Sequence, residues 1–256
     1  MLCFSKTSQI YCYDNPFNES NLNYQFVEMN TAGRDFICGD VHGYFDILET
    51  LLNKHNFNPL GDRLFSVGDL IDRGEDSTQV LDWLNKPWFY AVQGNHERML
   101  IDVVESQSEE TKQQWLNWGG KWAKGLDDSV LQVYYQALIT LPAAIEIELS
   151  KNGNVGLVHA ELPDKCDWHQ VKDMLICASK NIEENHAISN MFWTRAQPFY
   201  DDIRSQQVQH VKNINYVFHG HTPVEQYKTI SNRTFLDLGS YSTGKIGLID
   251  VREFLN

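Results

Sequence analysis

The chain is poor in cysteine, and the arrangement of the few cysteines excludes two common uses of this residue. Five cysteines occur in 256 residues, far apart along the chain: Cys3, Cys12, Cys38, Cys166 and Cys177. None forms the Cys-x-x-Cys spacing of structural zinc sites and redox motifs. A disulfide framework is not expected either, because such frameworks pair an even number of cysteines. The sequence therefore predicts a protein of a reducing compartment.

Segments that would target the chain to a membrane are also missing. The N-terminal residues lack a basic stretch followed by an apolar one, which is the pattern of a secretory signal. No run approaches the ~20 apolar residues that a membrane span requires. We therefore expect a cytoplasmic protein with no membrane partner.

Positive charge is scarce as well. The chain carries 21 Lys and Arg against 34 Asp and Glu, which gives a formal net charge of −13. Proteins bind nucleic acids largely by neutralising phosphates with Lys and Arg, so a nucleic-acid partner is not expected. A pair of bound divalent cations would still make a cleft locally positive, whatever the overall charge.

Three short segments rich in Gly, Asp and His stand out in the first hundred residues. Each ends an apolar run, and their sequences are Gly39-Asp40-Val41-His42-Gly43, Gly68-Asp69-Leu70-Ile71-Asp72-Arg73-Gly74 and Gly94-Asn95-His96-Glu97. Two further histidines, His159 and His221, follow later in the chain. Asp, Asn and His supply oxygen and nitrogen donors that bind Mn, Fe, Mg or Zn. The order and spacing of the segments therefore predict a metal site, and carboxylates that bridge two ions would allow it to clamp a phosphate.

The first half of the chain alternates strand-like and helical patterns. Apolar runs that end at a glycine cover residues 35–38, 64–67 and 88–92. Helical patterns follow them at residues 44–52, 77–85 and 98–104. In sheets built from such units, ligands bind at the carboxyl ends of the strands. We therefore expect the three motifs to converge.

The second half contains more strand and fewer crossovers. Strands are expected at residues 143–149, 155–159, 216–218, 234–238 and 246–251. They suggest a second sheet that faces the first. The predicted fold class is therefore mixed α/β (α+β), with two facing mixed β-sheets flanked by helices. One catalytic domain of residues 34–256 is expected to follow an N-terminal extension of residues 1–33, in which we identify no chemistry.

Three tryptophans between the two halves have two interpretations. Trp115, Trp118 and Trp122 are at helical spacing around Gly119-Gly120. Aromatic residues at this spacing commonly pack a helix onto the core, and this is the favoured interpretation. The alternative is that they form a wall of the substrate cleft.

Taken together, the motifs resemble those of a known family. GDxHG, GDxxDRG, GNHE, a later His-Ala and a Gly-His-Thr-Pro are similar to the motifs of the calcineurin-like metallophosphoesterases, and within them of the phosphoprotein phosphatases. The resemblance is closest to the bacterial and phage branch typified by the bacteriophage lambda serine/threonine phosphatase. It covers about residues 34–251 and implies a β-sandwich with helices on both sides.

The resemblance implies a centre of two divalent metal ions. Asp40 and His42 would hold the first ion, Asp69 would bridge both ions, and the second ion would be completed by Asn95, His159 and His221. Mn is the ion that the resemblance suggests, while Fe, Zn and Mg stay open because such ligands accept several ions. A hydroxide between the ions would attack phosphorus in line, so that no protein nucleophile is needed.

The resemblance also implies roles for four residues that do not bind metal. His96 would be the general acid that contacts the substrate and protonates its leaving group, a contribution of roughly 10²- to 10⁴-fold in rate. Asp72 would orient His96 and favour its cationic form, although a turn or helix-capping role is an alternative. Arg73 and Arg195 would bind phosphate oxygens, since a guanidinium can hold two at once. Arg195 lies in a looser match, so a surface salt bridge is its alternative.

The expected activity is that of a serine/threonine protein phosphatase which tolerates phosphotyrosine and aryl phosphates. Its partner would be a phosphoprotein or phosphopeptide, and a monomer is expected. One alternative is a dinucleoside polyphosphate (diadenosine tetraphosphate) hydrolase, whose second motif usually lacks the acid found here at Asp72. Another is a metal-binding scaffold without catalysis, which the complete set of motif residues argues against. Glu97 is expected to hydrogen-bond backbone or neighbouring groups. For His219 and Tyr241 two interpretations stay open, a packing role and a place beside the site.

Overall fold

The computed structural model describes residues 24–150, 153–162, 167–176, 182–195 and 210–255. The strands in chain order are β1 (Tyr24–Val27), β2 (Asp35–Cys38), β3 (Arg63–Ser66), β4 (Phe89–Ala91), β5 (Ala144–Ser150), β6 (Gly153–Val158), β7 (Tyr216–His219), β8 (Lys228–Ile230), β9 (Arg233–Phe235) and β10 (Leu248–Asp250). The α-helices are α1 (Phe45–Lys54), α2 (Val80–Leu84), α3 (Asn95–Ser106), α4 (Glu109–Trp118), α5 (Asp128–Leu138), α6 (Trp168–Ile176), α7 (Ile182–Trp193), α9 (Ser240–Thr243) and α10 (Val251–Leu255). Two 3₁₀ segments are η2 (Glu75–Gln79) and η3 (Gly120–Ala123).

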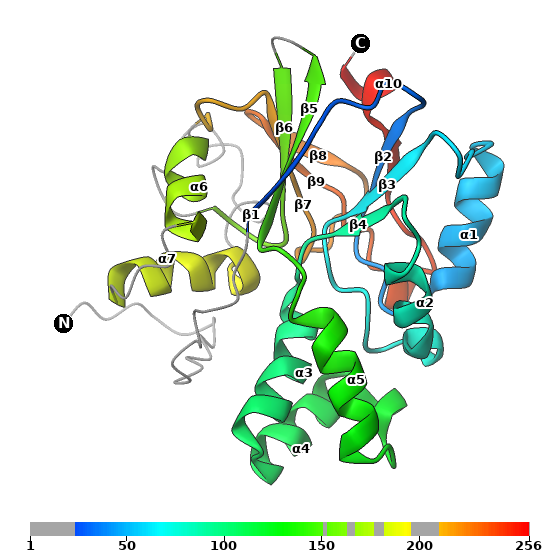
Figure 1. Ribbon diagram of the computed structural model, residues 1–256, viewed down its shortest axis with the longest axis vertical. Helices are drawn as coiled ribbons and strands as arrows, with labels where there is room; N and C mark the ends of the chain where they lie inside the picture. The colour runs from blue at the N-terminus through cyan, green and yellow to red at the C-terminus, as the bar shows by residue number, and fades with distance from the viewer. Residues whose placement is uncertain (1–23, 151–152, 163–166, 177–181, 196–209, 256) are drawn as a thin grey trace.

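The strands form two mixed sheets that face each other (Figure 1). The four-stranded sheet has the order β10-β2-β3-β4, and the six-stranded sheet has the order β1-β5-β6-β7-β9-β8. Strands β2, β3 and β4 are parallel, while β10 is antiparallel to β2. The predicted fold class, with two facing mixed sheets flanked by helices, is confirmed.

Alternation along the strands of the four-stranded sheet divides its side chains between two apolar clusters. Successive residues of a strand point to opposite faces, and Phe36 and Leu64 join the cluster that also contains residues of α1 and α2. Their neighbours Ile37 and Phe65 join a second cluster, which includes residues of the facing sheet such as Leu157. The second cluster is therefore the core between the two sheets, and α1 and α2 cover the outer face.

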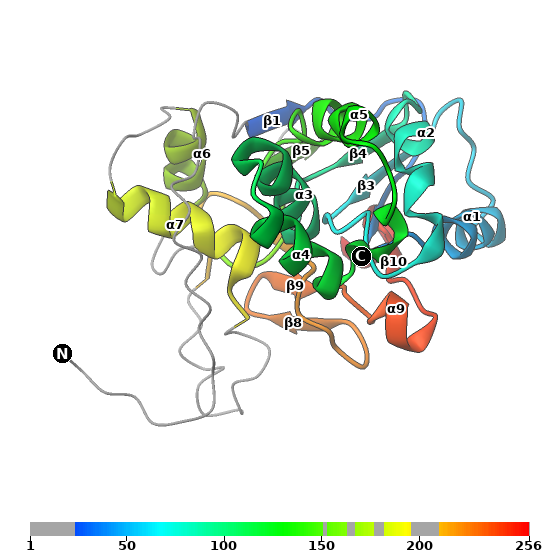
Figure 2. The same cartoon turned by 90° about the horizontal axis from the view of Figure 1, so that it is seen from below.

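A third apolar cluster covers the outer face of the six-stranded sheet. Val158 and Val217 of this sheet pack with Trp168 of α6 and Met191 of α7. Figures 1 and 2 show α6 and α7 on one side of the paired sheets and α1 and α2 on the other, with α3, α4 and α5 grouped together. The layers are therefore helix, sheet, sheet, helix.

The N-terminal segment contributes a strand that the sequence analysis did not anticipate. β1 pairs in parallel with β5, with Tyr24 opposite Ala144. The carboxylate of Glu146 on β5 accepts hydrogen bonds from the Tyr24 hydroxyl and, at 2.8 Å, from the indole Nε1 of Trp168. Residues 24–27 of the expected extension are thus part of the sheet, and we propose that the catalytic domain includes them. A short edge strand whose partner lies far along the chain leaves little local pattern.

Two further strands differ from expectation in the second half. β10 lies in the first sheet beside β2, although residues 246–251 were assigned to the second sheet. β8 was not predicted, and it pairs with β9. The strand expected at residues 234–238 ends at Phe235, which frees the residues after it to turn toward the site described below.

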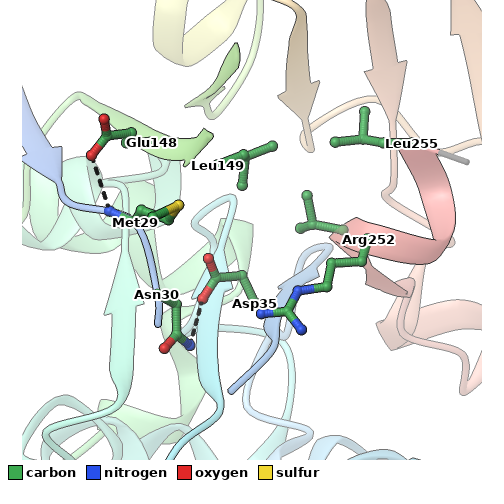
Figure 3. A pocket seen from close by; sticks show the side chains of 8 residues that line it. Met29, Asn30, Asp35, Glu148, Leu149, Arg252 and Leu255 are labelled. Carbon is green, nitrogen blue, oxygen red and sulfur yellow. Dashed lines mark hydrogen bonds between the residues drawn. The ribbon is translucent and has the colours of Figure 1, made fainter. Parts of the chain in front are cut away.

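A cavity of about 320 Å³ lies at the amino end of β2, away from the glycine-rich motifs. It is lined by Met29, Asn30, Asp35, Glu148, Leu149, Val251, Arg252 and Leu255. Asn30 donates to Asp35 over 3.2 Å, and the Met29 amide donates to Glu148 over 3.3 Å (Figure 3). None of the predicted site residues lines this cavity. Within the described ranges, no helix is both long and apolar enough to cross a membrane.

Candidate metal centre

The three glycine-rich motifs converge, because β2, β3 and β4 are parallel neighbours and each motif follows the carboxyl end of one of them. The backbone amide of His42 donates to the carbonyl of Asp69 over 2.8 Å. The amide of His96, in the first turn of α3, donates to the Asp69 carboxylate over 3.0 Å. His159 and His221 follow β6 and β7 of the facing sheet. The site therefore lies where the ends of both sheets meet.

The backbone turns sharply where it presents the site side chains. Nine described residues other than glycine have a positive φ, and five of them are site residues: His42, Asp69, Asp72, Arg73 and His221. Such conformations cost of order 1–3 kcal/mol each and persist only when the surroundings impose them. Because five of these residues lie at the site, the fold accepts a cost in conformational free energy there in order to direct their side chains toward one another.

Two glycines are required by close approach at the site. A Cβ atom on Gly94 would overlap the backbone amide and the carboxylate of Asp69. A Cβ atom on Gly220 would overlap the carboxylate of Asp40. Any larger residue at either position would displace a predicted metal ligand.

One group of ligand atoms consists of His42, Asp69 and His96, all within 4.8 Å of one another. The Nδ1 atom of His42 lies 3.1 Å from the carbonyl oxygen of Ile71, which can only accept, so the proton is on Nδ1. The Nε2 atom therefore carries a lone pair, and it lies 3.5 Å from the Asp69 carboxylate. Burial lowers the pKa of His42 well below its usual value, which keeps this imidazole neutral and able to bind a cation.

The second group consists of Asp69, His159 and His221, also within 4.8 Å. His159 donates from Nδ1 to the carbonyl of Val67 over 2.8 Å, so its Nε2 atom carries a lone pair. That atom faces the Oδ1 atom of Asn95 at 2.9 Å and the Asp69 carboxylate at 3.3 Å. The Oδ1 atom of Asn95 is also 2.8 Å from His221 Nδ1. Several acceptor atoms that point at one another fit a shared cation.

Asp69 belongs to both groups, as a bridging ligand would. Burial alone would raise its pKa, but the surrounding histidines, His159 first, hold that pKa well below its usual value. The carboxylate is therefore ionised between the two groups. A bridging carboxylate of this kind is what two ions a few ångströms apart require.

Asp40 completes the site from the end of β2. The backbone amide of His221 donates to both of its carboxylate oxygens, at 3.2 and 3.0 Å. Burial raises the pKa of Asp40, and the charges of Asp237 and Asp69 raise it further. Three buried acids thus crowd one region, an arrangement that a divalent cation would stabilise.

Asp237 was not singled out from the sequence. Its carboxylate is buried and accepts the Gly239 amide over 2.8 Å. Burial raises the pKa of Asp237, and the charge of Asp69 acts in the same direction. The available signal was an acid at the end of an apolar run, two residues before Gly239, whereas in the three motifs the glycine directly precedes the Asp or Asn.

His96 also forms a pair with a second carboxylate. Its Nδ1 atom lies 2.7 Å from the Asp72 carboxylate, and both side chains are buried. Its Nε2 atom lies 3.9 Å from Asp69, toward the ligand groups. The geometry therefore permits Asp72 to orient an imidazole whose other nitrogen faces the reaction centre.

The two arginines approach the site from different elements. Arg73 donates from NH1 to the Nε2 atom of His42 over 2.8 Å, and its guanidinium carbon lies 4.0 Å from the ring centroid of Tyr241. The Nε atom of Arg195 lies 3.2 Å from the Nε2 atom of His221, which is also 3.2 Å from the Trp193 carbonyl oxygen. Both guanidinium groups are therefore placed beside the ligand groups.

Glu97, His219 and Tyr241 lie close to the site residues but differ in what they contact. Glu97 accepts backbone N–H groups from two motifs, including that of Asp69 at 2.9 Å, as expected. His219 packs on Phe235 and donates to the Ala160 carbonyl, and burial lowers its pKa to about 3. It is thus a packed histidine. Tyr241 lies beside the site through its contact with Arg73.

Comparisons with known proteins agree with this site. The model of the calcineurin-like phosphoesterase family matches residues 36–225. Serine/threonine-protein phosphatase 2 of Escherichia coli is 31% identical over 234 residues, which cover 90% of this chain and 98% of that protein. A symmetrical bis(5'-nucleosyl)-tetraphosphatase of Histophilus somni is 31% identical over 135 residues, 52% of this chain and 41% of that protein.

A solved structure shares the fold. A protein serine/threonine phosphatase from Saccharomyces cerevisiae superposes with a TM-score of 0.57 at 18% identity, covering 86% of this chain and 72% of that one. The family match spans all three motifs as well as His159 and His221, and these segments supply the two groups of ligand atoms around Asp69. The chain therefore belongs to the calcineurin-like phosphoesterase family and is a phosphoester hydrolase.

Proposed function

We propose that this protein is a binuclear metal-dependent phosphomonoesterase that acts on phosphoserine and phosphothreonine in proteins or peptides. The observation that carries the proposal is the sharing of Asp69 by two groups of ligand atoms. The similarity to serine/threonine-protein phosphatase 2 over 90% of this chain supports the substrate class.

In this proposal Asp40 and His42 hold one ion, Asp69 is shared, and Asn95, His159 and His221 hold the other. When bound, two such ions activate water and neutralise phosphate oxygens. The protein fixes the ligands beforehand: backbone carbonyls orient His42 and His159, and the His221 amide orients Asp40. Ligands held in this way retain their geometry when the substrate binds. We propose Mn as the resident metal, with Fe, Zn and Mg as the ions to compare.

The remaining roles fall to groups beside the ligands. Arg73 and Arg195 bind the phosphate oxygens, since both guanidinium groups already lie against ligand histidines. His96 donates a proton to the departing serine or threonine oxygen, and Asp72 keeps its imidazole in position. An alkoxide is a poor leaving group, so this proton is worth roughly 10²- to 10⁴-fold in rate.

Hydrolysis of dinucleoside polyphosphates is the second candidate. Its support is the similarity to a symmetrical bis(5'-nucleosyl)-tetraphosphatase over 135 residues. That similarity covers 41% of the relative, whereas the phosphatase relative is covered over 98%. The presence of Asp72 in the second motif also favours the phosphatase. We further propose that the protein is a cytoplasmic monomer.

A substrate panel tests the proposal. The purified chain is stripped with a chelator and reloaded with Mn, Fe, Zn or Mg. It is then assayed on phosphoserine, phosphothreonine and phosphotyrosine peptides and on diadenosine tetraphosphate. We expect the highest kcat/KM on phosphoserine or phosphothreonine peptides. A higher kcat/KM on diadenosine tetraphosphate than on every peptide would overturn the proposal in favour of the second candidate.

A further inference from the structure

The Asp72 carboxylate accepts three N–H hydrogen bonds, only one of which comes from His96. Its Oδ2 atom accepts from His96 Nδ1 at 2.7 Å and from the indole Nε1 of Trp115 at 2.8 Å. Its Oδ1 atom accepts from the indole Nε1 of Trp122 at 2.7 Å. Asp72 is fully buried, so water does not supply these bonds in place of the indoles.

The two indoles fix the plane of the carboxylate. The terminal torsion of an Asp side chain is broad and roughly two-fold, so a single hydrogen bond from His96 would leave the carboxylate free to turn. Bonds to Trp115 and Trp122 occupy both oxygens from directions other than that of His96. The oxygen that faces His96 is therefore held in place.

Indole also has the chemistry that this position needs. It is an uncharged N–H donor with no acceptor atom, so in its hydrogen bond with Asp72 the indole can only donate and the carboxylate can only accept. A Lys or Arg in the same place would bring a positive charge that competes with the imidazolium of His96. Two indoles hydrogen-bond the buried oxygens without neutralising the carboxylate, so the negative charge of Asp72 remains available to interact with His96.

The segment that carries the tryptophans is shaped to reach Asp72. Trp115 lies in the last turn of α4 and Trp122 lies in η3. Their rings meet edge to face, with 6.1 Å between the ring centroids. Between them, Gly119 has a φ of +141°, its carbonyl accepts the Arg73 amide over 2.9 Å, and a Cβ atom there would lie 3.1 Å from the Asp72 Cβ. This close backbone contact brings both indoles onto one carboxylate.

We propose that Trp115 and Trp122 are positioning residues for the general acid, acting through Asp72 on His96. This inference rests on the proposed function, in which His96 protonates the leaving group. It assigns the two tryptophans a role beyond core packing, and one distinct from a wall that touches the substrate.

The test uses Trp122→Phe and Trp115→Phe, which keep an aromatic ring and remove the N–H group. We expect kcat on a phosphoserine peptide to fall by about 10- to 10²-fold, with KM and bound metal unchanged. On p-nitrophenyl phosphate, whose leaving group needs no proton, kcat should fall by less than about 3-fold. Because Trp115 is fully buried, its variant could unfold, and the half-buried Trp122 then carries the test.

Trp168→Phe is the matched control. Trp168 is a buried indole that donates to a carboxylate, Glu146, at 2.8 Å in another part of the fold. Its loss should lower the melting temperature without changing the ratio of the two activities. An equal loss on both substrates in Trp122→Phe, or no loss on either, would overturn the inference.

A double-mutant cycle separates positioning from general damage. In a His96→Asn background, Trp122→Phe should cause no further loss, because the group it positions is gone. A further loss of the same size as in the wild-type background would contradict the inference. If the wild-type chain proves to cleave only diadenosine tetraphosphate, the proposed function fails, and the same cycle on that substrate still decides whether Trp122 acts through His96.

Discussion

The Nε2 atom of His159 lies 2.9 Å from the Oδ1 atom of Asn95, so two hydrogen-bond acceptors face each other inside the protein. The Val67 carbonyl fixes the His159 proton on the other nitrogen. Burial lowers the pKa of His159, so a second proton does not bridge the gap. A cation is the group that makes this contact favourable, and this relationship leads to the first prediction.

Chelation should remove both activity and stability. We expect turnover to fall by more than about 10²-fold in EDTA, since the ions are proposed to supply several kcal/mol of stabilisation to the transition state. At about 100 times its Kd, added Mn should stabilise the fold by roughly 2.7 kcal/mol. That corresponds to about 5 to 10 °C in melting temperature for a chain of this size. Full turnover in a chain shown by elemental analysis to be free of metal would contradict this.

Replacement of the shared ligand should be worse than replacement of any other. Asp69 belongs to both ligand groups, whereas His42 belongs to one. Asp69→Asn should therefore weaken the binding of both ions, and His42→Ala should chiefly weaken the binding of one. Calorimetric titration with Mn would measure this difference. Two ions bound to Asp69→Asn with wild-type affinity would rule out the bridging assignment.

The parts of the fold that carry the motifs could be predicted because the relevant signals are local. An apolar run that ends at a glycine marks β2, β3 and β4, and parallel pairing then brings their carboxyl ends together. The strand expected at residues 88–92 is observed as β4, and the helix expected from residue 98 begins three residues earlier, at Asn95. That earlier start places the amide of His96 on Asp69.

The parts that could not be predicted depend on contacts between distant residues. β1 and β8 are edge strands of three or four residues, and β10 pairs with β2 across most of the chain. Trp115 and Trp122 lie 43 and 50 positions from Asp72. Helical spacing predicted that Trp115, Trp118 and Trp122 pack on the core, which holds for Trp115 and Trp122 but not for Trp118, which is 40% exposed. The spacing contains no information about which carboxylate the indole N–H groups meet.

Tyr241 should affect substrate binding through Arg73. The guanidinium carbon of Arg73 lies 4.0 Å from the ring centroid of Tyr241, a contact worth about 0.5–2 kcal/mol. Tyr241→Ala should raise KM for a phosphopeptide by about 2- to 30-fold, because Arg73 is no longer held beside the phosphate. Tyr241→Phe keeps the ring and should retain the wild-type KM. A fall in kcat with KM unchanged would argue for a different role.

Asp102 on α3 provides a prediction about pH that is independent of the metal site. Burial raises its pKa from 3.8 to about 6, although Arg98 opposes the change. At a pH between these two pKa values, Asp102 is therefore protonated in the folded state and ionised in the unfolded state. Stability from this group is complete below about pH 4 and is lost as the pH rises through about 6.

Asp102→Asn removes this titration. Relative to the wild type, the variant should become more stable by about 3 kcal/mol as the pH rises from 4 to 7, because each pKa unit corresponds to about 1.4 kcal/mol. Denaturant titrations of both metal-free proteins across this range would measure the difference. A difference that stays constant with pH would show that Asp102 titrates normally in the folded state.

The last prediction separates acid catalysis from metal binding at His96. This residue lies within reach of both His42 and Asp69, so its geometry also permits a ligand role. If it is the acid, His96→Asn should keep its metal and lose about 10²- to 10⁴-fold in turnover on a phosphoserine peptide. The loss should shrink on p-nitrophenyl phosphate, because nitrophenolate leaves without a proton.

Asp72→Asn should show the same pattern more mildly. It removes the group that orients the imidazole, 2.7 Å from its Nδ1 atom, and leaves the imidazole itself in place. Metal analysis and the ratio of the two activities are the measurements for both variants. If His96→Asn loses its metal, or loses the same factor on both substrates, then His96 is a ligand or a phosphate contact, because a good leaving group can replace a missing acid but not a missing ion.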